Sequence, residues 1–379
     1  MTVVPVIYRG LEGVYVKESQ ICFIDGEKSR LLYRGYSIED LAGRATYEEV
    51  AALLLDGRLP TPARLREFST HLAGFRKVPD PIARILDELG PSAHPVDGLR
   101  TALSALGALD PAEGVDRAVE LERAFRTIAV MPSLVAHLRR VRDGQRPVPP
   151  RRDLGHAANF LCMLSGDPPD PEDARILDAL LVLHAEHELN ASTFACMVTA
   201  STRADLYAAV TSGIAALKGP LHGGANEDAL RFILETGSPE RAADKVRSAL
   251  EGGGRIPGFG HRVYKNFDPR YRVLREMAES LARRKSNGGL FATAAEIENH
   301  ALRRLSGSNI YPNVDFYSGL VMHLLGIPAA VFTPIFAVGR AAGWCAHILE
   351  QRERNRLLRP KAYYTGPSEL VYRPPEERE

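Results

Sequence analysis

A glycine-containing stretch in the last third of the chain carries side chains suited to an anionic, electrophilic ligand. Its sequence is Gly258-Phe-Gly-His-Arg-Val-Tyr-Lys-Asn-Phe-Asp-Pro-Arg270. The glycines allow backbone N–H groups to approach a ligand closely. His261 can donate a hydrogen bond to a carbonyl or alkoxide oxygen, and the planar guanidinium of Arg270 can bind a carboxylate through two parallel hydrogen bonds. The stretch therefore predicts a loop for a substrate that is both an anion and an electrophile.

Two further motifs supply more residues of this kind. Lys218-Gly-Pro-Leu-His-Gly-Gly-Ala-Asn226 contains His222, and Pro312-Asn-Val-Asp-Phe-Tyr-Ser-Gly319 contains Asp315. Together with the loop, these motifs resemble the signatures of the citrate synthase family, in which two catalytic histidines and a catalytic aspartate occur in the order His222, His261, Asp315. The likeness runs from Gly10-Leu-Glu-Gly13 to Tyr364-Thr-Gly366, which is nearly the whole chain. It is similar to the shorter, homodimeric archaeal and bacterial branch.

The resemblance implies formation of a carbon–carbon bond from an acetyl thioester. Such a reaction needs a base for a weakly acidic methyl proton, a donor for the enolate oxygen and a site closed to water. Desolvation between Val314 and Phe316 would make Asp315 a stronger base, although a lone Asp at this place also suits a helix N-cap. His222 precedes a predicted helix whose dipole would keep the imidazole neutral and able to donate to the thioester oxygen. The alternative is a histidine whose hydrogen bonds are satisfied within a turn.

The resemblance also implies a second substrate, the dicarboxylate oxaloacetate, whose ketone His261 would polarise. The residues implied to bind it are His187, Arg270, Phe336, Arg340 and Arg359, of which Arg359 comes from the second subunit of a homodimer. Gly339 would loosen the placement of Arg340, and His184 is implied to be a packed core residue. Without the resemblance, His184 and His187 would share one face of a helix and could be metal ligands. No third ligand is obvious nearby in the sequence, so we expect no metal.

Coenzyme A is implied as a thioester substrate, and no permanently bound cofactor is expected. The residues implied to bind it are Arg255, Ile256, Pro257, Gly258, Phe259, Lys265 and Arg262, the first five as a segment whose backbone recognises adenine. Pro257 departs from the family pattern and is expected to stiffen this segment. Arg76 is a further candidate for ligand contact, with a surface role as the alternative. The chain lacks a P-loop and a dinucleotide fingerprint, so ATP and NAD are not expected.

Composition narrows the class of protein. The chain has 379 residues, 45% hydrophobic and 25% charged, which is typical of a soluble globular protein with a sizeable core. A net charge of +1 gives no reason to expect nucleic acid or a membrane surface as partner. The apolar run 321–339 contains Pro328 and Pro334 and predicts buried core rather than a membrane span. Four scattered cysteines and the lack of a signal segment predict reduced thiols and a cytoplasmic location.

The spacing of apolar residues predicts a mainly α-helical fold. We expect helices over residues 37–55, 62–75, 81–89, 96–106, 114–142, 153–164, 171–188, 192–199, 204–217, 225–235, 239–251, 269–285, 291–305, 316–325 and 332–354. Strand signals over residues 15–23 and 31–33 flank a turn at Asp25-Gly26 and predict a small N-terminal β-hairpin. The resemblance implies a large helical domain (1–221 and 321–379), a smaller helical domain (222–320) and an active site in the cleft between them. The tail beyond Arg359 has no core of its own and is expected to dock on the partner subunit.

Three alternatives to a citrate synthase remain at this point. A 2-methylcitrate synthase would use propionyl-CoA, or the enzyme could accept both thioesters, because one methylene in a pocket contributes only about 1–3 kcal/mol. A catalytically silent CoA-binding paralogue is disfavoured by the intact His222, His261 and Asp315. A metalloenzyme built on His184 and His187 is the third. The motifs favour an acyltransferase that condenses acetyl-CoA with oxaloacetate and water to give citrate and CoA.

Overall fold

The computed structural model describes residues 6–378 and confirms the mainly helical fold. The α-helices of this part of the chain are α1 (Ile38–Leu41), α2 (Tyr47–Asp56), α3 (Pro62–Gly74), α4 (Asp80–Leu89), α5 (Pro95–Ala108), α6 (Arg117–Arg142), α7 (His156–Ser165), α8 (Pro171–His184), α9 (Ala191–Ser201), α10 (Leu206–Leu217), α11 (Ala225–Thr236), α12 (Ala242–Glu251), α13 (Pro269–Arg284), α14 (Gly288–Arg304), α15 (Val314–Leu324) and α16 (Phe332–Glu353). Short 3-10 turns occur at Arg9–Leu11, Pro239–Arg241, Ala329–Val331 and Pro375–Glu377.

Local capping sets several of the helix ends. The hydroxyl of Thr46 accepts the N–H of Glu49 while the Glu49 carboxylate accepts the N–H of Thr46, so this capping box starts α2. The single helix predicted over residues 37–55 is therefore wrong. Gly43 adopts a left-handed conformation with φ of +80° between α1 and α2. A residue without Cβ takes that conformation cheaply, so the chain turns there before the capping box restarts the helix.

The N-terminal hairpin is confirmed, with a third short strand added. Strands β1 (Cys22–Asp25), β2 (Arg30–Tyr33) and β3 (Tyr36–Ser37) form an antiparallel sheet in the order β1-β2-β3. Cys22 lies opposite Tyr33, and Asp25 lies opposite Arg30. The part of the predicted strand before Cys22 is wrong, because Tyr15 lies outside the sheet and is 94% exposed. That segment has no neighbouring strand, and Gln20 donates its N–H to the Glu350 carboxylate at 2.8 Å instead of to a β-ladder.

The sheet supports the glycine-containing loop described above. The carbonyl oxygen of Gly26, in the β1–β2 turn, accepts the N–H of Lys265 at 3.1 Å. The carbonyl oxygen of Glu27 accepts a hydrogen bond from Asn266 Nδ2 at 2.7 Å. A Cβ on Gly26 would lie 2.3 Å from the carbonyl oxygen of Val263, so only glycine permits this close contact. The hairpin thus holds the far side of the loop that carries His261.

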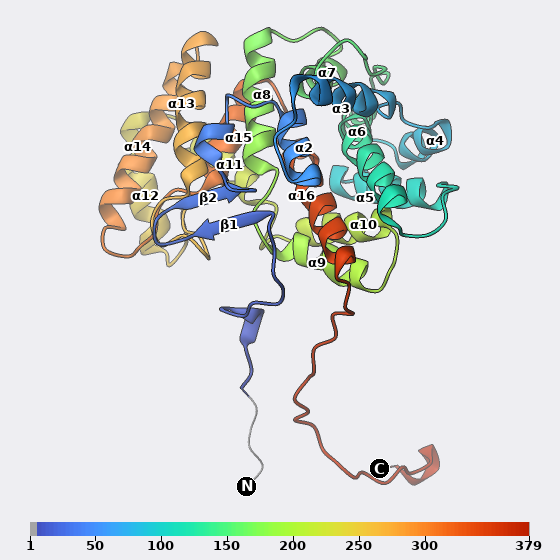
Figure 1. Cartoon of the computed structure of the whole chain (residues 1–379). Coiled ribbons are helices and arrows are strands. Elements are labelled where there is room, and N and C mark those ends of the chain that lie inside the picture. The colour runs from blue at the N-terminus through green and yellow to red at the C-terminus, as the bar shows by residue number, and fades with distance from the viewer. Residues whose placement is uncertain (1–5, 379) are drawn as a thin grey trace.

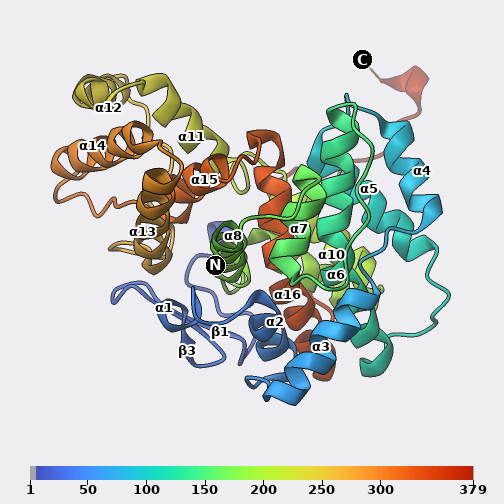
Figure 2. The same ribbon diagram turned by 90° about the horizontal axis from the view of Figure 1, so that it is seen from above.

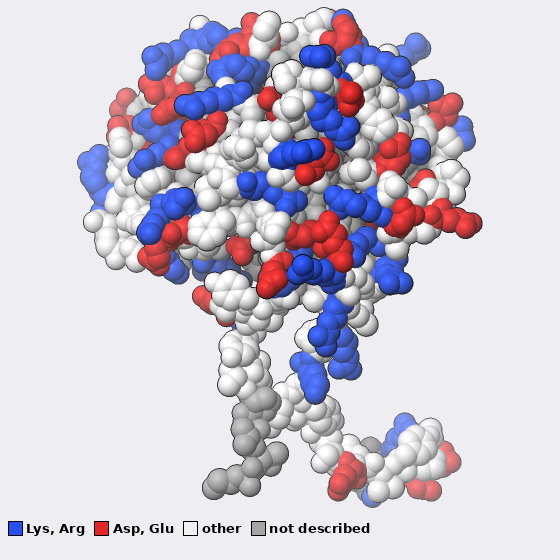
Figure 3. Space-filling model, viewed as in Figure 1, with Lys and Arg blue, Asp and Glu red and all other residues white. Residues whose placement is uncertain are grey.

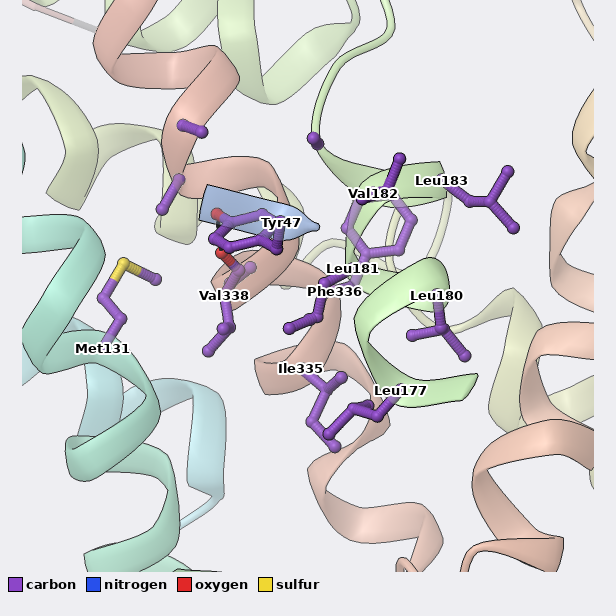
Figure 4. Close-up of a cluster of buried hydrophobic side chains, with 14 of the residues drawn as sticks. Tyr47, Met131, Leu177, Leu180, Leu181, Val182, Leu183, Ile335, Phe336 and Val338 are labelled. Carbon is purple, nitrogen blue, oxygen red and sulfur yellow. Dashed lines mark hydrogen bonds between the residues drawn. The ribbon is translucent and has the colours of Figure 1, made fainter. Parts of the chain in front are cut away.

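The core is centred on α16, which packs against α2, α6, α8, α9 and α10. Figure 4 shows side chains of α8 and α16 meeting there, among them Leu181, Ile335 and Val338, with Tyr47 donating to the Val338 carbonyl oxygen at 2.9 Å. The helical stretch Ala329–Glu353 is apolar and long enough to cross a membrane, but 89% of its apolar window is buried inside the protein. This confirms the prediction that the apolar run entering α16 is core.

The helices fall into two groups on either side of α8. Figures 1 and 2 show α11 to α15 together on one side, and α2 to α7, α9, α10 and α16 on the other. The N-terminal segment and the tail after α16 both leave the body in the same direction (Figure 1). These groups agree in outline with the predicted division at residues 221 and 321, which remains a proposal.

The surface carries both signs of charge. Figure 3 shows Lys and Arg interspersed with Asp and Glu over the visible face, without a continuous region of one sign. All four cysteines are free, and three of them, Cys162, Cys196 and Cys345, are buried. A surface hollow of about 680 Å³ lies along α3 and is lined by residues between Ala63 and Phe75, none of which is a predicted site residue.

Candidate active site

The loop that carries His261 is attached to the N-terminus of α15. The N–H of Gly260 donates to the Tyr311 carbonyl oxygen at 2.8 Å, and the N–H of Asn313 donates to the Gly258 carbonyl oxygen at 2.9 Å. Gly258 has φ of +77°, and a Cβ on it would lie 2.7 Å from the Cα of Phe316. Only glycine fits at this contact, so the signature glycine fixes the spacing between the His261 loop and the helix of Asp315.

Asp315 is not the N-cap of α15. The cap is Asn313, whose side-chain oxygen accepts the N–H of Asp315 at 2.9 Å. The carboxylate of Asp315, in the first turn, is therefore not used for capping. Burial raises the pKa of Asp315 to about 6, against the opposing effect of the Arg270 guanidinium. A carboxylate with this pKa is a stronger base than an exposed one and is still ionised at neutral pH.

His261 is held as one tautomer by its own loop. Its Nδ1 accepts the N–H groups of Val263 at 2.9 Å and Tyr264 at 3.1 Å. Burial is the main cause that lowers the pKa of His261 to about 4, so the ring is neutral at physiological pH. Since Nδ1 accepts two hydrogen bonds, the proton is on Nε2, which can donate to a ligand.

His222 is held as the opposite tautomer. Its Nε2 accepts the N–H of Ser192 at 3.3 Å and lies 3.0 Å from the Ser192 hydroxyl oxygen. Burial, with a contribution from Arg340, lowers the pKa of His222 to about 4. The ring is thus neutral with its proton on Nδ1. Neutrality was expected, but from the dipole of the following helix; the N-terminus that His222 actually contacts is that of α9.

Ser192 is a positioning residue that sequence analysis did not identify. It is fully buried in the first turn of α9, and its hydroxyl oxygen also accepts the indole N–H of Trp344 at 3.2 Å. The turn after His222 is held separately, because Thr333 donates to the Gly223 carbonyl oxygen at 2.9 Å. Nothing in the local sequence signals either contact, since α9, α16 and the His222 turn are distant along the chain.

Arg270 forms a two-pronged ion pair with Asp268. The distances are 2.9 Å from Nε to Oδ1 and 2.7 Å from Nη2 to Oδ2, and both residues are buried. Burial acts to lower the pKa of Arg270, but the Asp268 carboxylate raises it overall. Asp268 also caps α13 and accepts the N–H of Val314 at 3.2 Å. Its place before Pro269 is a typical N-cap signal, so the sequence could have identified this residue.

The segment after α8 differs from the predicted helix. The helix was expected to continue through residue 188 but ends at His184, and Glu188 adopts a left-handed φ of +54°. His184 and His187 therefore do not share a helical face, and the metal-ligand interpretation built on that face is wrong. Within residues 6–378, no group of three or more His, Cys, Asp or Glu side chains is arranged to hold a metal ion.

The two histidines have different environments. His184 is buried, donates from Nδ1 to the Leu180 carbonyl oxygen at 2.7 Å and packs edge-on against Phe336. His187 Nε2 lies 3.2 Å from the Tyr264 hydroxyl, and the centroid of its ring is 5.2 Å from that of His261. Burial lowers the pKa of His187 well below its usual value. His187 therefore lies beside the His261 loop, as a substrate-binding residue must.

Arg340 is buried with unused hydrogen-bonding capacity. Its Nε donates to the His184 carbonyl oxygen at 2.7 Å, its guanidinium carbon is 4.9 Å from the centroid of the Phe336 ring, and its Nη1 has no hydrogen-bond partner in the described chain. Gly339 does not loosen this placement. A Cβ there would lie 2.9 Å from the Cβ of His184, so glycine allows α16 to pack closely on α8.

Other predicted residues lie outside this cluster. Arg359 is exposed in the segment that follows α16, and Figure 1 shows the tail after α16 leaving the body of the protein. Arg76 is buried elsewhere and donates from Nη1 to the carbonyl oxygens of Arg151 and Leu154, both at 2.7 Å, so the structure gives it a loop-fixing contact. In the predicted CoA segment, Ile256 and Gly258 are buried, Pro257 and Phe259 are partly buried, and the cationic side chains are exposed: Arg255, Arg262 and Lys265.

The cluster thus contains one carboxylate with a raised pKa, two neutral imidazoles with opposite tautomers, and buried arginines. This arrangement defines a helical enzyme that can remove a weakly acidic proton while donating hydrogen bonds to two oxygens. The family model for "Citrate synthase, C-terminal domain" matches residues 10–361. The chain belongs to the citrate synthase family, whose members are acyltransferases.

Individual relatives match over nearly their full length. The chain is 45% identical to a citrate synthase of Deinococcus radiodurans over 97% of both chains. It is 41% identical to a 2-methylcitrate synthase of Mycobacterium tuberculosis over 97% of this chain and 92% of the relative. A citrate synthase of Thermoplasma acidophilum, solved as a ternary complex with carboxymethyl coenzyme A and oxaloacetate, superposes with a TM-score of 0.94 at 34% identity, covering 99% of this chain and all of the other.

Proposed function

We propose that this protein is a citrate synthase, which condenses acetyl-CoA with oxaloacetate and water to give citrate and CoA, the entry step of the tricarboxylic acid cycle. The observation that carries the proposal is that His222 and His261 are neutral with opposite tautomers, and that the carboxylate of Asp315 has a raised pKa. Within residues 6–378, neither Nε2 of His261 nor Nδ1 of His222 makes a side-chain hydrogen bond, so each can donate to a ligand oxygen. The carboxylate of Asp315 does not cap α15.

In the first step, Asp315 removes a proton from the methyl group of acetyl-CoA. The Nδ1–H of His222 donates to the thioester oxygen and stabilises the enol or enolate that forms. Because the ring is neutral, it stabilises the developing charge by a hydrogen bond and does not protonate the oxygen outright. The N–H of Ser192 on Nε2 keeps the proton on the nitrogen that faces the ligand.

In the second step, the enol carbon attacks the ketone of oxaloacetate and a carbon–carbon bond forms. The Nε2–H of His261 polarises the ketone oxygen and passes its proton to the new hydroxyl as the bond forms, and the proton that Asp315 removed from the methyl group restores the neutral ring. Arg270, Arg340, His187 and Arg359 of the second subunit bind the carboxylates, and Phe336 lines the pocket. Water then hydrolyses the resulting citryl-CoA to citrate and CoA.

Coenzyme A binds along residues 255–259, with Lys265 and Arg262 as phosphate-binding cations. The exposed position of these cations beside the buried Gly258 supports this assignment. Residues 222–320 form the small domain, and its movement toward residues 1–221 and 321–379 closes the cleft over both substrates and excludes water. The location is cytoplasmic, and no permanently bound cofactor is needed for this chemistry.

The protein acts as a homodimer whose subunits share Arg359. Apolar and aromatic side chains are exposed on both terminal segments, including Tyr15, Tyr364 and Tyr372, and surfaces of this kind are usually covered by a partner. Heterodimers of Arg359→Ala with His222→Ala chains should have one working site in two, because one site then receives both intact residues. Mixed dimers that remain inactive would contradict sharing.

A second candidate function is that of a 2-methylcitrate synthase, which uses propionyl-CoA. The relative from Mycobacterium tuberculosis supports it, since that enzyme is nearly as similar as the citrate synthases. The same catalytic residues would serve both thioesters. The two thioesters differ by one methylene group, and a pocket discriminates for or against one methylene by only about 1–3 kcal/mol of transition-state binding free energy.

Release of free thiol from acetyl-CoA and propionyl-CoA, each with and without oxaloacetate, tests the proposal. The Asp315→Asn variant should fold normally and lose about 10³-fold in kcat, because an amide cannot accept the methyl proton. The ratio of kcat/KM for the two thioesters identifies the enzyme. No oxaloacetate-dependent release from either thioester by the wild-type protein would contradict both functions and leave a silent CoA-binding paralogue.

A further inference from the structure

One face of α16 lies along the segment that follows α8. Residues Phe336, Arg340, Gly343 and His347 recur at helical spacing and therefore point to the same side. Phe336 and Arg340 contact His184, as described above. Gly343 and His347 contact Glu186, two residues further along that segment. The segment between His184 and His187 thus follows α16 in order.

Glu186 is a fully buried carboxylate with an unusual set of partners. Its exposed fraction is 0%, and Oε1 lies 3.0 Å from Nε2 of His347, which is also fully buried. Its Oε2 makes no hydrogen bond within residues 6–378. A Cβ on Gly343 would lie 2.2 Å from Oε2, so glycine at this position creates the space for the carboxylate. A buried charge in such a position needs a compensating charge nearby.

Arg340 is the buried arginine on this face, one turn before Gly343. Its Nη1 is likewise without a partner in the described chain. The two groups are not hydrogen-bonded to each other, yet the Glu186 carboxylate is the charge that most favours the cationic form of Arg340, which burial disfavours. Each therefore stabilises the charge of the other through space while keeping hydrogen-bonding capacity unused.

We propose that Glu186 is the resident counter-anion of Arg340 and that it weakens the binding of oxaloacetate by competing for the charge of this arginine. The inference rests on the proposed function, because it assigns Arg340 to the substrate. A dianion brought to Arg340 is repelled by Glu186 in the same low-dielectric region. Glu186 thus stabilises the ligand-free site. It also prevents the substrate from binding so tightly that turnover would not benefit.

The Glu186→Gln variant separates charge from shape. Glutamine has nearly the same size and can still accept a hydrogen bond from His347 through its amide oxygen. Removing the negative charge leaves Arg340 uncompensated, so the ligand-free variant should unfold at a lower temperature than wild type. Oxaloacetate should bind about threefold to tenfold tighter, because the repulsion is gone. Oxaloacetate should therefore raise the melting temperature of the variant more than that of wild type.

Glu120→Gln is the matched control. Glu120 is equally buried and also faces arginines, Arg123 and Arg352, but it lies on α6 away from the cluster. This control should lower the melting temperature and leave the affinity for oxaloacetate unchanged. Calorimetric titration and thermal melts with oxaloacetate alone, without a thioester, give both quantities for each protein.

The outcomes separate this inference from the proposed function. If oxaloacetate does not raise the melting temperature of the wild-type protein, the proposed function itself is contradicted. If it shifts wild type but binds Glu186→Gln equally or more weakly, Glu186 has a purely structural role and the inference is overturned. Glu186→Asp, which keeps the charge, should bind oxaloacetate with an affinity close to that of wild type. If Glu186→Gln does not fold alone, saturating oxaloacetate should restore its fold, and failure to do so also overturns the inference.

Discussion

Arg123 and Arg340 are both buried, with 5% and 1% of their surface exposed, but they are paired very differently. Arg123 donates from Nε to Asp110 at 2.7 Å, from Nη1 to Glu120 and the Gly114 carbonyl oxygen, both at 2.7 Å, and from Nη2 to the Ala112 carbonyl oxygen. Arg340 donates to one carbonyl oxygen, and its Nη1 has no partner in the described chain.

The difference separates a structural charge from one that we propose binds the substrate. Around Arg123, each guanidinium nitrogen has an acceptor, so the buried charge is compensated in the folded chain and has nothing left to offer a ligand. Around Arg340, the fold holds a desolvated donor in place without satisfying it. An anion that binds there regains the missing hydrogen bonds in a region of low dielectric constant, where they are strong.

The Arg123→Gln variant should show the largest loss of stability. It leaves the carboxylates of Asp110 and Glu120 buried with less positive charge nearby, which costs about 3–5 kcal/mol of unfolding free energy. Denaturant unfolding measures this loss, and the KM for oxaloacetate of the folded fraction should not change. An unfolding midpoint equal to that of wild type would show that the network around Arg123 does not stabilise the fold.

The Arg340→Gln variant should show the opposite pattern. Its KM for oxaloacetate should rise about 100-fold, because a buried charge-assisted contact to the substrate is lost. Its unfolding free energy should fall less than that of Arg123→Gln, because one buried carboxylate, Glu186, is left with less positive charge nearby instead of two. Its KM for acetyl-CoA should stay close to that of wild type. A loss of stability similar to that of Arg123→Gln, with unchanged KM, would remove the distinction between the two arginines.

The pH dependence gives a smaller test of the site. Asp315 must be ionised to act as a base, and its pKa is raised to about 6, so kcat/KM should fall about tenfold per unit as the pH drops below that value. His222 and His261, with pKa values of about 4, remain neutral over that range and add no second limb. If log kcat/KM fell by two units per pH unit just below pH 6, an imidazole would also be becoming charged in this range.

The fold must be monitored in the same experiment. Other buried histidines, among them His184, have a lower pKa in the folded protein than in the unfolded chain. The stability that their neutral rings contribute is therefore present above about pH 6.5 and is lost as the pH falls. Circular dichroism at each pH separates loss of the fold from protonation of the base. Activity that declines while the spectrum is unchanged is assigned to Asp315.

The three motifs could be found from the sequence because their chemistry is local. Glycine at position 258 and proline at 269 act on their own backbone, and the apolar periodicity that predicts the helices is a property of each segment. The helix break at Gly43 and the end of α8 at His184 were not predicted. At Gly43 the apolar pattern continues past the end of the helix, although the glycine and the capping box of Thr46 and Glu49 are local signals for the break. At the end of α8, Glu186 and His187 contact residues distant in the chain, and such tertiary contacts override local propensity.

By itself, the sequence determined the family and the helical character, and it predicted the residues of the candidate site: His222, His261, Asp315, Arg270, Arg340 and His187. Only the tertiary structure decided which nitrogen of each histidine carries the proton, because Ser192 reaches His222 from another helix and the loop of His261 folds its own N–H groups back onto the ring. It also decided that Asn313 rather than Asp315 caps α15 and that Asp268 and Glu186 accompany the arginines. Protonation, tautomer and counter-charge depend on distances between segments far apart in the chain, and those distances exist only in the folded protein.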